Sequence, residues 1–211
     1  MRRAYAAFFV LGLAAFLFTV SPSKASAADQ EPFYAGILGG YVMPQSLSGS
    51  GGSETISLKN SWAIGAKAGY IIPGTQKWLA AEMEYQYLAN QDVDVSGLSG
   101  HFAANNLMFN LIVRYPDGKI HPYAGGGMGC SWGTLNAFAT VPSITGSVDQ
   151  TQSAFGWQLL AGVNYEFAPK WSADLAYRYF SSKYNFTSRE GVSADVTASS
   201  NMILLGINYH F

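Results

Sequence analysis

Apolar and polar residues alternate with a period of two along most of the chain beyond residue 32. The pattern is clearest near the end, where Ile203, Leu205 and Ile207 share one face and Asn208 and His210 share the other. Since successive side chains of a β-strand point to opposite faces, this alternation predicts strands with one apolar face. We expect eight strands, at 33–43, 60–72, 78–91, 101–115, 121–132, 153–167, 171–184 and 199–211.

The connections between these strands alternate in length. Those at 73–77, 116–119 and 168–170 are short and rich in Pro, Gly and Lys, which is typical of tight turns. Those at 44–59, 92–100, 133–152 and 185–198 are long and rich in Ser, Gly, Thr and Asp, and we expect loops there. Short turns on one side and long loops on the other are the layout of an outer-membrane barrel, with both termini on the periplasmic side.

Charge is scarce, and its placement narrows the fold class. Charged residues make up 12% of the chain, whereas a soluble domain carries about 25%. The few charges on the strands lie opposite the apolar rows, at Lys67, Glu82, Glu84, Arg114, Glu166, Asp174 and Arg178. A soluble sandwich or a lipocalin-like barrel would place such charges in water among many others. We therefore predict an all-β protein, an eight-stranded antiparallel up-and-down transmembrane β-barrel, closed because lipid does not tolerate unpaired strand edges.

The first 27 residues have the features of an export signal. Arg2 and Arg3 precede an apolar stretch at 6–20, and Ala25 and Ala27 fit the small-residue pattern of a cleavage site. A membrane anchor is the alternative, but the stretch is short for a span. We predict a cleaved signal peptide at 1–27 and a barrel at 28–211. The remaining chain has nine basic and 13 acidic residues, which predicts no nucleic-acid partner.

Aromatic residues gather at both ends of the expected strands, as in the girdles that flank the apolar band of membrane barrels. The periplasmic group comprises Tyr70, Trp78, Tyr115, Tyr165, Phe167, Trp171, Tyr209 and Phe211. The outer group comprises Trp62, Tyr85, Tyr87, Phe155, Trp157 and Tyr179. This sorting predicts contact with outer-membrane lipid and lipopolysaccharide.

Three segments carry a family resemblance. The closing residues at 208–211 resemble the terminal signature of outer-membrane barrels, and those at 122–129 and 174–179 resemble strands of the small eight-stranded opacity and surface-antigen barrels, the OmpA and OmpX kind. The resemblance covers 33–211. It implies insertion by the barrel-assembly machinery, with Tyr209 and Phe211 as the insertion signal. It does not specify an activity, since such barrels include adhesins, serum-resistance proteins, membrane tethers and narrow pores.

The seven strand charges are expected to form a network in the lumen. Eight strands enclose an interior just wide enough for side chains to fill, and charges there must pair or take water. A polar plug that closes the pore is our first interpretation, and a narrow porin-like ion path is the alternative. A catalytic carboxylate pair at Glu82 and Glu84 is a third, weaker interpretation. We expect no catalytic residue, no metal site and no cofactor.

Inward apolar residues are expected above the charges, at Met108, Leu160, Phe180, Met202 and Leu204, with Leu88 at the same level. They either pack on one another or line a small apolar pocket that opens to the outside, and such a pocket would serve as an apolar-solute pore. Of the three histidines only His101 lies near the outer rim, without a serine or metal-ligand spacing that would indicate an enzyme. We predict a non-enzymatic structural and surface-interaction protein that acts through its long loops on an extracellular ligand.

Overall fold

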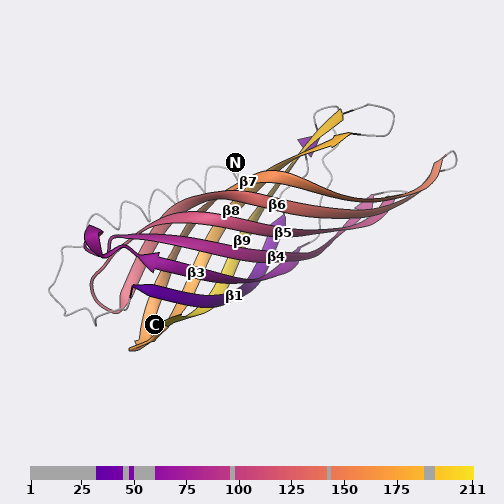
Figure 1. The fold of residues 1–211 in the computed structure, drawn as a ribbon. Helices are drawn as coiled ribbons and strands as arrows, with labels where there is room; N and C mark the ends of the chain where they lie inside the picture. The colour runs from indigo at the N-terminus through magenta and orange to yellow at the C-terminus, as the bar shows by residue number, and fades with distance from the viewer. Residues whose placement is uncertain (1–31, 45–47, 50–59, 96–97, 142–143, 188–192) are drawn as a thin grey trace, which may run out of the picture.

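The computed structural model describes residues 32–44, 48–49, 60–95, 98–141, 144–187 and 193–211, and these are almost entirely β-strand (Figure 1). The expected signal peptide lies outside these residues. The strands are β1 (Phe33–Pro44), β2 (Ser48–Gly49), β3 (Ser61–Ile71), β4 (Leu79–Val95), β5 (Leu98–Arg114), β6 (Ile120–Val141), β7 (Ile144–Ala168), β8 (Trp171–Thr187) and β9 (Ser193–His210), with a 3-10 turn at Pro73–Thr75. Within the described part of the chain, no helix is long and apolar enough to span a membrane.

The long strands form a closed barrel. Apart from the two-residue β2, which pairs with the outer end of β9, each strand pairs antiparallel with its neighbour in sequence. β9 then pairs back onto β1, from Tyr34 opposite His210 to Pro44 opposite Ser200. Nine strands less β2 leave eight in the closed ring. The predicted eight-stranded antiparallel up-and-down barrel is confirmed, and closure leaves no long strand with an unpaired edge.

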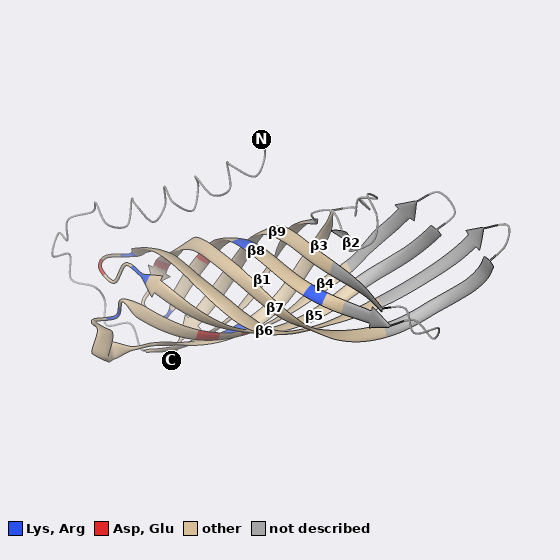
Figure 2. Ribbon diagram, turned by 90° about the horizontal axis from the view of Figure 1, so that it is seen from above, with Lys and Arg blue, Asp and Glu red and all other residues tan. Residues whose placement is uncertain are grey.

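The two faces of each strand differ as the sequence pattern predicts. On β9, Leu205 is 65% exposed, whereas Met202 and Leu204 next to it are at most 1% exposed. Large apolar side chains are exposed on each of the eight strands, and few charged positions lie on the strands (Figure 2). Exposed apolar surface of this extent is unfavourable in water and favourable against hydrocarbon. The outer surface of the barrel is therefore a lipid-facing one.

Aromatic contacts define both ends of this apolar band. At the end with the short turns, the rings of Trp171 and Tyr209 are 5.0 Å apart and those of Trp78 and Tyr115 are 5.9 Å apart. Toward the other end, Trp157 lies 5.5 Å from Tyr179. Amphipathic rings at two depths match the two membrane–water interfaces.

The expectation of long loops was wrong at three of the four connections. Pairing continues to Val95 opposite Leu98, to Val141 opposite Ile144 and to Thr187 opposite Ser193, so that paired hairpins project beyond the barrel (Figure 1). Above a membrane both faces of a strand meet water, and the apolar alternation that reveals a strand in sequence disappears while backbone pairing persists. Most of the fourth expected loop, 44–59, lies outside the described residues.

Candidate functional site: the barrel lumen

The seven charged residues named from the sequence all point into the barrel, where none is more than 8% exposed. The structure brings most of them together in pairs. Lys67 on β3 lies between two carboxylates, with Nζ 2.6 Å from Asp174 Oδ2 on β8 and 3.3 Å from Glu82 Oε2 on β4. One lysine thus connects three strands and offsets part of the charge of two acids.

A second ion pair crosses the full width of the barrel. Arg178 on β8 donates from Nη1 to Glu84 Oε1 on β4, and each residue is 1% exposed. β4 and β8 are four strands apart in either direction around the ring, so they face each other across the lumen. The contact therefore joins opposite walls of the barrel.

Tyrosine and amide side chains complete the shell around the acids. Tyr34 donates to Glu82 Oε2 at 3.0 Å, and Tyr123 donates to Asp174 Oδ1 at 2.9 Å. Asn110 donates to Glu82 Oε1 at 3.2 Å and in turn accepts from Gln158 at 2.7 Å. Buried carboxylates are stable only when their oxygens are hydrogen-bonded in this way. Sequence analysis missed these neutral partners, although they all occupy inward positions of the alternating pattern.

Glycines on the inner wall provide room for the two tyrosines. A Cβ built on Gly162 would lie 2.6 Å from the hydroxyl oxygen of Tyr123, and one on Gly69 would lie against the ring of Tyr34. Side chains of this size fit only because the opposite position has none.

Replacing Gly162 with alanine should therefore destabilise the barrel. The methyl group would clash with the carbonyl oxygen of Leu175, so the backbone would have to shift, and it would push Tyr123 off Asp174. A hydrogen bond to a charged group contributes about 1.5–3 kcal/mol. The free energy of unfolding, measured by urea titration in detergent, should fall by at least this amount. Gly126→Ala is the matched control, because its Cβ would make only ordinary contacts, the nearest at 3.5 Å. Equal effects of the two changes would contradict this account.

A separate polar cluster lies at the periplasmic end. His121 Nδ1 donates to the carbonyl of Tyr115 at 2.9 Å, and its Nε2 is bonded to Glu166 Oε1. Because the carbonyl can only accept, the Nδ1 proton is fixed, and a further proton must lie between Nε2 and the carboxylate. The His121–Glu166 pair therefore carries no net charge. Nearby, Ser172 accepts from Asn164 and Asn208 and lies 3.2 Å from Nε2 of His210.

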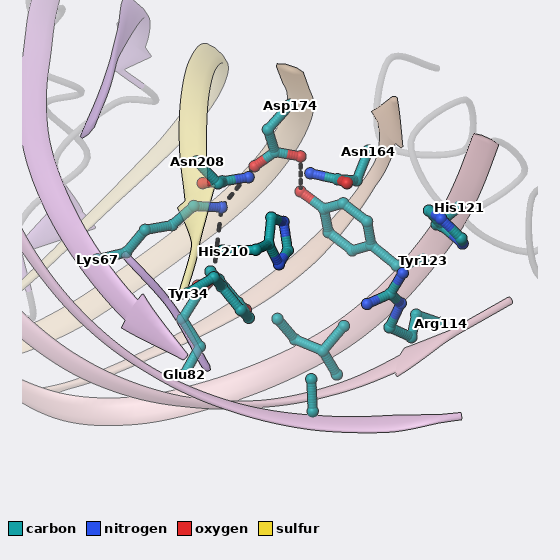
Figure 3. A pocket seen from close by; sticks show the side chains of 12 residues that line it. Tyr34, Lys67, Glu82, Arg114, His121, Tyr123, Asn164, Asp174, Asn208 and His210 are labelled. Atoms are coloured by element: carbon teal, nitrogen blue, oxygen red, sulfur yellow. Dashed lines mark hydrogen bonds and ion pairs between the residues drawn. The ribbon is translucent and has the colours of Figure 1, made fainter. Parts of the chain in front are cut away.

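Arg114, the seventh residue, is not brought into either network. It is 8% exposed and its backbone amide donates to the carbonyl of Trp78 at 2.8 Å, but its guanidinium makes no hydrogen bond or ion pair with another described residue. It lines a cavity of about 40 Å³ together with Lys67, Glu82 and Asp174 from the central network and His121 and His210 from the periplasmic cluster (Figure 3).

The apolar residues expected above the charges form a packed layer. Met108, Leu160, Phe180, Met202 and Leu204 are each at most 4% exposed, and they belong to one hydrophobic cluster with Leu88. The cavity described above lies in the other half of the lumen and is lined by different residues. Above this layer, Ser131 donates to Asn106 at 2.5 Å and lies 2.7 Å from the hydroxyl of Tyr184. This geometry favours mutual packing over an open apolar pocket.

Two further candidates from the sequence are the pair of Glu82 and Glu84 and the histidine His101. Glu82 and Glu84 lie on the same face of β4, but each is paired with a different cation, Lys67 or Arg178. His101 lies on β5 opposite Asp92 and Asn136, and its side chain lies outside the described part of the structure.

A closed barrel with an apolar outer band and a charged, paired interior defines the class of small transmembrane β-barrels. The sequence matches the family described as the outer membrane protein beta-barrel domain over residues 11–211. The chain belongs to this family, and its location is the cell outer membrane. No match was found among curated proteins.

Solved structures share the fold at low sequence identity. Neisserial surface protein A is 19% identical with a TM-score of 0.56, covering 85% of this chain and 97% of that one. Ail, the attachment invasion locus protein of Yersinia pestis, is 13% identical with a TM-score of 0.52, covering 85% and 99%. A major outer membrane protein from Thermus thermophilus is 10% identical with a TM-score of 0.51, covering 85% and 99%. These likenesses are to the fold alone.

Proposed function

We propose that this protein is a plugged, non-enzymatic outer-membrane barrel that acts at the cell surface through its extracellular hairpins. The observation that carries the proposal is the pair formed by Arg178 and Glu84, which joins opposite walls of the barrel. Together with Lys67 and its two acids, it fills the central lumen with bonded side chains. The lumen then stabilises the barrel and does not serve as a route for solute.

The hairpins support the surface role. β6 pairs with β7 along its whole length, up to Val141 opposite Ile144, well beyond the aromatic contact that marks the outer interface. Binding residues in proteins concentrate on segments that a rigid scaffold holds in place. Relatives in fold include proteins named for the surface and for attachment and invasion, which agrees with this role, although the likeness in sequence is low.

Recording from planar bilayers tests the plug. The native protein should give little or no stable conductance. The double change Arg178→Ala and Glu84→Ala should raise the frequency of openings, because it removes the contact between opposite walls. Lys119→Ala, at an exposed position in a periplasmic turn, is the control and should leave the bilayer silent. Steady openings of the native protein whose current changes in Arg178→Gln would establish the channel alternative and overturn the plug.

Trimming one hairpin tests the surface role. Leu135 and Gln150 are paired, so residues 136–149 can be replaced by Asn-Gly, the preferred two-residue hairpin turn. Cells carrying the trimmed protein should adhere less to one another and to protein-coated surfaces, at an unchanged level of folded barrel. The double change in the lumen should leave adhesion intact. If the trimmed protein supports native adhesion, this hairpin has no part in it.

A further inference from the structure

Arg114 is the one interior cation named from the sequence that forms no direct ion pair within the described residues, although the charge of Glu166 acts on it from a longer distance. Lys67 contacts two acids, Arg178 contacts Glu84, and Glu166 is bonded to His121. Arg114 ends β5 at the periplasmic end of the barrel, and the residue as a whole is 8% exposed. A buried guanidinium without a partner is costly, so its hydrogen-bonding groups require either water or a ligand.

The cavity in front of Arg114 has room for such a ligand. Its volume is about 40 Å³, and one ordered water needs about 10–15 Å³ measured in this way. It therefore has room for about three or four waters, a halide ion or the carboxylate group of a small acid. Figure 3 shows Arg114 on the side where His121 lies, away from Lys67 and its acids. One side of the cavity therefore presents Arg114. The other side presents Lys67, Glu82 and Asp174, which are already paired with one another.

The charges around the cavity determine how many negative charges a bound anion should carry. Lys67 with Glu82 and Asp174 has a net charge of −1, and the pair of Arg178 and Glu84 is neutral. The His121–Glu166 pair is also neutral, because it shares one extra proton. Arg114 is left with +1. A single negative charge is matched at Arg114, whereas the second charge of a dianion would have no cation and would double the repulsion by the excess negative charge beside Lys67.

We propose that this cavity is a binding site for a small monovalent anion, a halide or a short carboxylate, which enters from the periplasm and is held by Arg114. The planar guanidinium presents paired donors that match a carboxylate and that also suit a halide. Both tyrosine hydroxyls on the wall already donate to carboxylates, which leaves Arg114 as the principal donor. The ligand supplies the direct ion-pair partner that Arg114 does not find among the described side chains.

Chloride NMR of the full-length barrel refolded in detergent tests the site. Native protein should broaden the chloride signal saturably beyond a detergent blank, and acetate should compete. Phosphate at a pH where it is a dianion should compete far less. Arg114→Gln should weaken chloride binding by about tenfold or more, equivalent to about 1.4 kcal/mol. Ala80→Leu, which keeps the guanidinium but fills the cavity from β4, should have the same effect.

Lys119→Gln is the matched control, since it removes one positive charge from the same end of the barrel at an exposed position. It should bind chloride as the native protein does. Folding of each variant is checked by the mobility difference between unheated and heated samples in gels. The proposal is overturned if the native protein shows no saturable broadening. It is also overturned if any folded variant of Arg114 or Ala80 binds as the native protein does, and Ala80→Leu decides if Arg114→Gln does not fold.

Discussion

Replacing Arg178 with methionine should lower the free energy of unfolding by about 3–5 kcal/mol, the effect expected when one partner of a buried ion pair is removed. Glu84 would then remain on the opposite wall as a carboxylate that is 1% exposed and has lost its cation. The effect is measured by urea unfolding of the protein in detergent or lipid vesicles, followed by tryptophan fluorescence.

The double change Arg178→Met and Glu84→Met should recover most of this loss. Arg178 Nε and Glu84 Oε2 are buried and have no partner among the described residues, so the pair is not fully hydrogen-bonded. Replacing such a pair by apolar side chains of similar size is often neutral or stabilising. A single change that costs less than about 1 kcal/mol would show that the pair contributes nothing unusual for a point substitution. Failure of the double change to recover stability would mean that packing, and not charge, holds this layer together.

Deleting Phe211 should strongly reduce the amount of protein assembled in the outer membrane while it changes the stability of refolded barrel only slightly. The Phe211 amide donates one hydrogen bond to the carbonyl of Phe33 at 3.1 Å, which contributes about 0.5–1.5 kcal/mol. Its ring is 59% exposed and lies 5.3 Å from that of Tyr209. We propose that the assembly machinery recognises the terminal aromatic side chain. The loss of assembly should then be much larger than the small loss of stability would explain.

Cell fractionation with immunoblotting measures assembly, and urea unfolding of refolded protein measures stability. Phe33→Ala is the matched control, because it removes a similarly exposed aromatic at the same end of the barrel but keeps the terminal residue. That variant should reach the membrane at nearly the native level. Parallel losses of assembly and stability in the Phe211 deletion would assign this residue a structural role only.

Much of the lumen could be placed from the sequence because strand geometry fixes the face of every residue. Once Leu205 is assigned to the outside, Met202 and Leu204 follow to the inside, and the same parity places Glu84 on β4 and Arg178 on β8. Parity does not say which side chains meet. That depends on the register and on the position of each strand in the ring, which brings β4 opposite β8.

The extracellular hairpins are the part of the fold that the sequence pattern did not reveal. Within lipid, one face of each strand must be apolar, so the membrane-spanning part is visible in the sequence. Above the membrane the same strands continue to Val141 and Ile144 without that constraint, and their composition resembles that of loops. Only the continued backbone pairing in the structure shows that β6 and β7 are strands there.

The sequence by itself determined the class, the number of strands and the inward position of every lumen charge, since alternation and the cost of unpaired backbone in lipid admit few other solutions. Tertiary structure decided how these charges are shared. Lys67 forms ion pairs with two carboxylates, and His121 is bonded to Glu166. Arg114 lines a cavity and forms no direct ion pair within the described residues. The reason is physical: pairing depends on distances across the lumen that are set by ring closure, and a linear pattern of residues contains no such distance.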